Sequence, residues 1–99
     1  MRIDEILASA DSPVFSFEFF PPKTPEGEQA LRSSLQALRE LEPAFASVTY
    51  GAGGSTRGHT VEITKWIKQE LGIEAMAHLS CVGSSRCDLR EILDGIEAA

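Results

Sequence analysis

Short strand-like segments alternate with longer segments of helical periodicity, and this alternation constrains the fold more than any other feature of the sequence. Three segments are short and rich in apolar residues, as strands are: residues 14–20, 44–50 and 74–81. Each is followed by a segment in which apolar side chains recur at helical spacing. Strands joined by crossover helices run parallel, so the pattern predicts an α/β fold with the order αβαβαβα.

The helical segments carry recognisable start and stop signals. Four helices are expected, within residues 3–10, 23–41, 59–71 and 82–99. Thr24 is a suitable N-cap for the second helix, with Pro25 in its first position, and Gly72 is a suitable C-cap for the third. Apolar stripes run along the last three helices, formed by Leu31, Leu35, Leu38 and Leu41, by Ile63, Ile67 and Leu71, and by Leu89, Ile92, Leu93 and Ile96.

The number of strands restricts the architecture further. A parallel sheet is covered on both faces or is closed into a barrel, and three strands cannot close one. The sequence contains no linker and no low-complexity tract. We therefore expect residues 1–99 to be the N-terminal part of a catalytic barrel domain. They would form the first three strand–helix units of a (β/α)8 TIM barrel, truncated from a domain of about 250 residues.

Composition excludes several classes of function. Acidic residues outnumber basic ones by 15 to 9, and the resulting net charge of −6 argues against a nucleic-acid or anionic-membrane partner. No apolar run approaches the roughly 20 residues of a membrane-spanning helix. The N-terminus lacks the apolar core of a signal peptide, so a cytoplasmic protein is expected. Cys81 and Cys87 are too few for a zinc site and are expected to be reduced thiols, with no metal bound.

Glu18 lies in the middle of the most apolar stretch of the chain, "VFSFEFFPPK". Because side chains alternate along a strand, Phe17 and Phe19 share one face while Ser16 and Glu18 share the other. In a barrel the second face points inward, and Glu18 is near the carboxyl end of its strand, where barrel active sites are built. A carboxyl group held among aromatic side chains is poorly solvated, which favours its protonated form and suits a general acid. The alternative is a glutamate that is paired with a lysine or arginine, or simply exposed.

Two further segments contain candidate binding residues. The segment "SVTYGAGGST" places glycines directly after a strand and before a helix, as a ligand loop does, although a plain turn would look the same. It lacks the spacing of a dinucleotide-binding motif and the lysine of a P-loop. In "AHLSC", His78 lies in the third expected strand, at the same relative height as Thr49 and Glu18 in theirs. Its imidazole could hydrogen-bond a cofactor, or it could be an ordinary core or rim residue.

Taken together, "FSFEFFPPK", "SVTYGAGGSTR" and "AHLSC" resemble the methylenetetrahydrofolate reductase family over nearly the whole chain. The resemblance implies an eight-stranded barrel that binds FAD. NADH or NADPH would reduce the flavin, and the reduced flavin would pass a hydride to methylenetetrahydrofolate, giving methyltetrahydrofolate in one-carbon metabolism. It also implies that the parent protein is a homo-oligomer.

The resemblance assigns roles to individual residues. It makes Glu18 the general acid that helps to open the five-membered ring of the folate. Thr49 is expected near the folate or the nicotinamide. The positions expected at the flavin are Tyr50, Gly51, Ala52 and His78. Because the later strands supply most of the FAD and folate contacts in the family, residues 1–99 by themselves are expected to be inactive.

Two other classes of protein remain as alternatives. One is an FAD-dependent barrel enzyme of the proline dehydrogenase type, which would not need the glutamate of "FEFFPP". The other is a small non-enzymatic α/β module that binds an anion through residues 51–56. Further strand–helix units after Ala99 would argue against the module.

Overall fold

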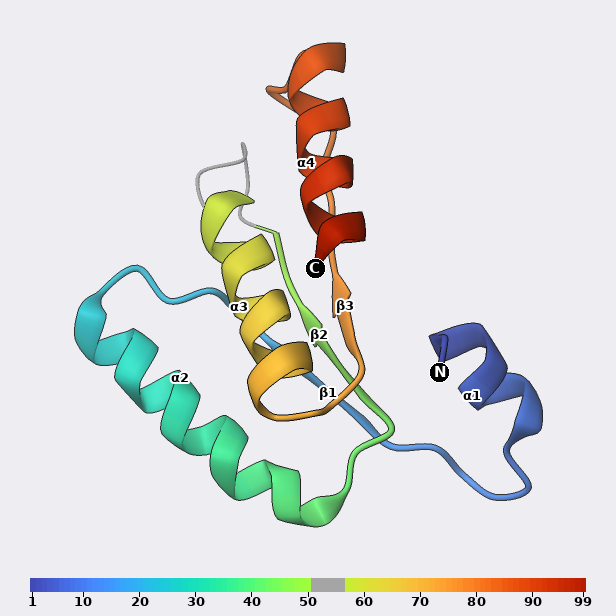
Figure 1. Ribbon diagram of the computed structural model, residues 1–99. Coiled ribbons are helices and arrows are strands. Elements are labelled where there is room, and N and C mark those ends of the chain that lie inside the picture. Colours follow the sequence, from blue (N-terminus) through green and yellow to red (C-terminus); the bar gives the residue numbers. More distant parts are fainter. Residues whose placement is uncertain (51–56) are drawn as a thin grey trace.

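The computed structural model describes residues 1–50 and 57–99, and it contains the alternating order of elements that the sequence predicts (Figure 1). The elements are α1 (Ile3–Ser9), β1 (Ser16–Phe19), α2 (Pro25–Leu38), η1 (Arg39–Leu41), β2 (Phe45–Val48), α3 (Arg57–Glu70), β3 (Ala75–Ala77) and α4 (Arg86–Ala98). The predicted ligand loop, with Gly51, Ala52 and the residues up to 56, lies outside the described residues.

The three strands form one parallel sheet in the order β1-β2-β3, so each strand pairs with the next one along the chain. The α/β fold with parallel strands is therefore confirmed. All three strands are shorter than predicted. β3 in particular ends at Ala77, so His78 lies one residue beyond it rather than inside it.

The register of the sheet separates the side chains into two faces. Glu18 lies beside Ser47, and Ser47 lies beside Met76, so these three side chains form one row across the sheet. The row before and the row after it along the strands point to the opposite face of the sheet, because neighbouring residues of a strand face opposite sides. These rows consist of Phe17, Ala46 and Ala75, and of Phe19, Val48 and Ala77.

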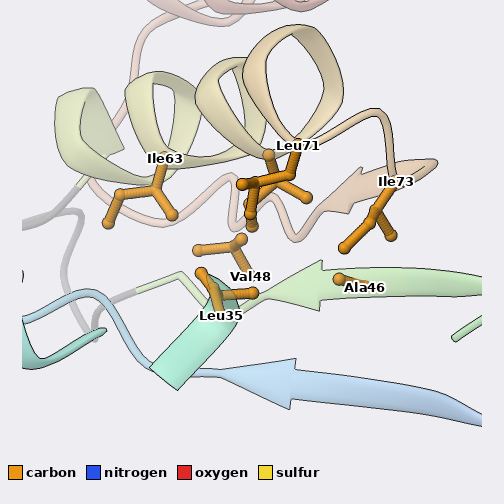
Figure 2. Close-up of a cluster of buried hydrophobic side chains, with 7 residues drawn as sticks. Leu35, Ala46, Val48, Ile63, Leu71 and Ile73 are labelled. Atoms are coloured by element: carbon orange, nitrogen blue, oxygen red, sulfur yellow. The ribbon is translucent and has the colours of Figure 1, made fainter. Parts of the chain in front are cut away.

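The hydrophobic core lies between helices α2 and α3 and the face of the sheet that is opposite Glu18 (Figure 2). Its buried members are Leu35, Ala46, Val48, Ile63, Ile67, Leu71 and Ile73. The stripe predicted for α3 is confirmed, because Ile63, Ile67 and Leu71 are all in this core. In the stripe predicted for α2, Leu35 is buried but Leu41 is 67% exposed. The chain tightens into a 3-10 helix at η1, which rotates Leu41 away from the α-helical stripe.

The start of α2 and the end of α3 show the expected capping, and the start of α4 has a cap that was not predicted. The Thr24 hydroxyl accepts a hydrogen bond from the Gly27 N–H at 3.0 Å, and Pro25 is the first residue of α2. Gly72 follows α3 with a φ of 68°, a left-handed conformation that suits a glycine C-cap. Ser85 and Asp88 cap the start of α4 reciprocally, each side chain accepting from the other residue's N–H.

The face that carries Glu18 is much more exposed than the face that carries the core. The Glu18 side chain is 54% exposed, and Met76 is 40% exposed. Phe20, which follows β1, is 75% exposed. Ser47, on the central strand, is the buried member of the row at 5%. This open face is therefore the part of the sheet where a ligand could reach the strands.

Candidate active site

The carboxyl ends of the three strands lie at the same edge of the sheet, because the strands are parallel. Two backbone hydrogen bonds extend the sheet by one residue at this edge. The Thr49 N–H donates to the Phe19 carbonyl at 2.9 Å, and the His78 N–H donates to the Val48 carbonyl at 2.9 Å. These bonds hold Thr49 and His78, two of the residues singled out from the sequence, at the edge where α/β proteins build their sites.

Glu18 and His78 approach each other across the central strand. The distance between Glu18 Oε2 and His78 Nε2 is 3.9 Å, which is too long for a hydrogen bond but short enough for an ion pair with a protonated imidazole. The two residues are not at the same height, as the sequence suggested. Val48 lies beside Ala77, so His78 is level with Thr49, whereas Glu18 is level with Ser47. The two side chains therefore meet diagonally.

The environment of Glu18 differs from the one expected from its sequence neighbours. Phe17 and Phe19 are partly buried on the opposite face, so they do not surround the carboxyl group. The side chain is instead 54% exposed, in a row with Ser47 and Met76. Within the described residues, the group at ion-pair distance from it is the His78 imidazole, which carries a charge only when protonated, rather than the lysine or arginine of the alternative interpretation.

Thr60 is a residue of this region that the sequence reasoning missed. It lies in the second turn of α3, it is completely buried, and its hydroxyl donates to the Thr49 carbonyl at 3.0 Å. The bond joins α3 to the carboxyl end of β2. One signal in the sequence could have identified it, because Thr60 falls on the same helical stripe as Ile63 and Ile67. A hydroxyl group on a buried stripe needs a hydrogen-bond partner.

Tyr50 presents an unusual polar atom. Its hydroxyl oxygen is buried and has no hydrogen-bond partner within the described part of the chain. Buried polar groups are almost always paired in proteins, so such an atom marks a place where a ligand or another segment would supply the partner.

The open face as a whole combines apolar and polar groups. Met76 offers exposed apolar surface in the same row as the polar side chain of Glu18, which approaches His78, and Phe20, which follows β1, is also exposed. Ligand sites are built from apolar surface with a few well-placed polar groups. The open face therefore has the mixed apolar and polar composition of a ligand site.

Residues 1–50 and 57–99 lack the features of several other kinds of site. In these residues no three histidine, cysteine, aspartate or glutamate side chains come together as possible metal ligands. No helix in the same ranges is both long enough and apolar enough to span a bilayer. Cys81 and Cys87 are exposed free thiols.

A parallel strand–helix repeat with a carboxylate and an imidazole at the carboxyl edge of its sheet belongs to the class of α/β proteins that place their sites at that edge. Within this class, the family model of methylenetetrahydrofolate reductase matches residues 2–99. The chain therefore belongs to the methylenetetrahydrofolate reductase family, as its three motifs predicted.

Individual relatives agree with this assignment. The chain is 52% identical over 77 residues to the 5,10-methylenetetrahydrofolate reductase of Pectobacterium carotovorum, and 49% identical over 77 residues to that of Escherichia coli. Each match covers 78% of this chain and 26% of the relative. A plant relative, methylenetetrahydrofolate reductase (NADH) 1 of Arabidopsis thaliana, is 45% identical over 67 residues, which is 68% of this chain and 11% of the relative. The chain thus spans about a quarter of the length of the bacterial relatives.

Proposed function

We propose that residues 1–99 are the N-terminal part of the catalytic, FAD-binding barrel of a methylenetetrahydrofolate reductase. The complete enzyme would reduce methylenetetrahydrofolate to methyltetrahydrofolate with NADH or NADPH as the reductant. The observation that carries this proposal is the family match over residues 2–99, combined with a glutamate on the open face near the carboxyl edge of the sheet.

The topology supports a barrel as the parent fold. Each strand pairs with the next along the chain, as successive strands of a (β/α)8 barrel do. The core-forming helices α2 and α3 pack on one face, which would become the outside of the barrel. The other face carries a glutamate, Glu18, on the edge strand β1. Burying that face under a second helix layer would desolvate the charge, whereas a barrel interior can use it in a site.

Glu18 is proposed as the general acid of the reaction. In its protonated form it would donate the proton from a carboxyl oxygen to a ring nitrogen of the folate. The adjacent carbon–nitrogen bond then breaks, the five-membered ring opens, and the resulting iminium is the acceptor for hydride. A general acid has to be within hydrogen-bond reach of the atom that it protonates, and the 54% exposure of Glu18 on the open face allows this approach.

Other residues of the chain are proposed to bind the flavin and the substrates. Bound FAD would supply the hydride chemistry, accepting a hydride from the nicotinamide and delivering it to the folate. Tyr50, Gly51, Ala52 and His78 would contact the flavin, and Thr49 the folate or the nicotinamide. The hydroxyl of Tyr50, which is buried and has no hydrogen-bond partner among residues 1–50 and 57–99, supports its assignment to a ligand contact.

The experiment that tests this function uses the full-length protein that contains residues 1–99. The purified protein is expected to contain flavin that NADH or NADPH bleaches in the absence of oxygen. Addition of methylenetetrahydrofolate should then restore the flavin absorbance. The names of the Arabidopsis and maize relatives specify NADH, so NADH is the first reductant to test. A protein without flavin, or a reduced flavin that the folate does not reoxidise, would overturn the proposal.

A further inference from the structure

The carbonyl group of Thr49 cannot complete the hydrogen-bond ladder between β1 and β2. The Thr49 N–H donates to the Phe19 carbonyl at 2.9 Å, which extends this ladder by one residue beyond β2. In a parallel ladder, a residue that donates to one residue of the neighbouring strand accepts from the residue two positions further along that strand. For Thr49 that residue is Pro21, which has no N–H to donate. The Thr49 carbonyl therefore needs a donor from outside the sheet.

Thr60 supplies this donor from α3, which begins near the end of β2 (Figure 1). Its hydroxyl donates to the Thr49 carbonyl at 3.0 Å, and the residue is completely buried. A buried hydrogen bond does not compete with water, and the branched threonine side chain has few rotamers, so the hydroxyl is held in place. The peptide groups of Thr49 are thus fixed from two directions, its N–H by β1 and its carbonyl by α3.

We propose that Thr60 is a positioning residue for Thr49 and that it acts on substrate binding through the backbone of Thr49. The inference rests on the proposed function, which assigns Thr49 to the folate or the nicotinamide. By alternation along the extended β2, the Thr49 side chain is on the same face as Ser47 and Glu18. The carbonyl and the side chain share one Cα, so a bond that fixes the carbonyl also limits the movement of the side chain.

The expected consequence is a loss of affinity for the substrate that Thr49 binds. T60V replaces the hydroxyl with a methyl group of similar size in the full-length reductase. The apparent dissociation constant of that substrate should rise about two- to tenfold, the usual contribution of one neutral hydrogen bond. A bond made equally in the ground state and the transition state changes this constant rather than the limiting rate.

The two constants are measured in separate anaerobic experiments on protein with bound flavin. The dependence of flavin reduction on NADH concentration gives one constant. The dependence of flavin reoxidation on methylenetetrahydrofolate concentration gives the other. Rates are expressed per bound flavin, so that a variant with a lower flavin content is compared fairly.

A double-mutant cycle with T49V separates positioning from a general loss of structure. T49V removes the hydroxyl that would bind the substrate and should itself raise the same constant. In the T49V background, T60V should change this constant by less than about 1.5-fold, because residues that act together are non-additive. A merely structural effect of T60V would be equally large in both backgrounds.

Two further variants make the comparison specific. T60S retains the hydroxyl and should recover most of the affinity. I67V shortens a completely buried core residue about two turns further along α3, and it should destabilise the protein while leaving both constants unchanged. If T60V does not fold, T60A and T60S replace it in the cycle, since these two variants differ only in the hydroxyl.

The possible outcomes are distinguishable. A raised constant in T60V that T60S restores and that disappears in the T49V background would support the positioning role. An effect of T60V that persists in the T49V background, an equal effect of I67V, or a T49V protein with both constants unchanged would overturn it. Failure of methylenetetrahydrofolate to reoxidise the wild-type flavin would contradict the proposed function itself.

Discussion

The buried hydroxyl of Thr60 in α3 donates a hydrogen bond to the carbonyl oxygen of Thr49, directly after β2, at 3.0 Å. The bond connects the two parts of the chain that flank residues 51–56. These are the edge of the sheet at Thr49 and the helix α3 at Thr60. The position of Thr49 and Tyr50 at the candidate site therefore depends on a residue of the helix that packs behind the sheet.

Substitution of Thr60 should destabilise the protein more than the small size of the threonine side chain suggests. T60V keeps the shape of the side chain but leaves the Thr49 carbonyl without this donor, so the free energy of unfolding should fall by about 1–3 kcal/mol. T60S keeps the hydroxyl and should lose less. Urea denaturation measures both values.

Thr64 provides the matched control on the same helix. Its hydroxyl donates to the Thr60 carbonyl at 2.7 Å, an interaction within α3 rather than between α3 and the sheet. T64V should change the free energy of unfolding by less than about 0.5 kcal/mol. A T60V protein as stable as T64V would contradict the assigned role of Thr60.

The contact between α2 and α3 includes a cation–π interaction. The guanidinium carbon of Arg32 lies 4.4 Å from the centroid of the Trp66 ring, and Trp66 packs against the core. R32M keeps an apolar chain over the ring but removes the charge, and should cost about 0.5–1 kcal/mol of stability in thermal unfolding.

The salt bridge on the same arginine serves as the comparison. Glu28 Oε1 accepts from Arg32 at 2.9 Å, in an i,i+4 pair whose two side chains are each 38% exposed. E28Q should cost only about 0.3–0.5 kcal/mol, as such pairs do. If E28Q proves to be the more damaging change, the ring contact is not the main contribution of Arg32.

Glu74 should make the stability depend on pH. The hydrogen bond from the Lys68 side chain lowers the pKa of the Glu74 carboxyl, against the opposing effect of burial, and the Lys68 charge, the Ala75 N–H and the Met1 amino group lower it further. A carboxyl whose pKa is lower in the folded state stabilises the fold above its unfolded pKa of about 4.3. This contribution is lost as the pH falls through the folded pKa.

The variant E74Q tests this dependence. At pH 6 it should melt at a lower temperature than the wild type, and the difference should shrink steadily as the pH is lowered from 5 towards 3. K68M should show the same pattern, because it removes the partner of the same carboxylate. A difference in melting temperature that stays constant over this range would show that Glu74 acts through something other than its charge.

The order of the elements could be predicted from the sequence because periodicity is a local property of the chain. The positions of Thr24 and Gly72 at helix ends were also correct, since caps depend on a few neighbouring residues. The ends of the strands were less accurate. Strand length depends on which partner residues continue the ladder, so His78 was placed in a strand that ends at Ala77.

The candidate site illustrates the same limit. Alternation correctly placed Glu18 and Phe17 on opposite faces, but it could not show how well the carboxyl group is solvated, which depends on what covers each face. The contact between Glu18 and His78 joins residues 60 positions apart and depends on the sheet register. The partner of Thr60 lies across residues 51–56 and is likewise a product of tertiary structure.

The central claim is that Glu18 protonates the folate, and the variant E18Q in the full-length reductase tests it most directly. Glutamine preserves the shape and the hydrogen-bonding capacity of the side chain but has no acidic proton. Anaerobic stopped-flow measurement of the flavin absorbance follows the two half-reactions separately. Reduction by NADH or NADPH should change little, whereas reoxidation by methylenetetrahydrofolate should slow by about 10²-fold or more. An unchanged rate of reoxidation, or equal slowing of both half-reactions, would contradict the account.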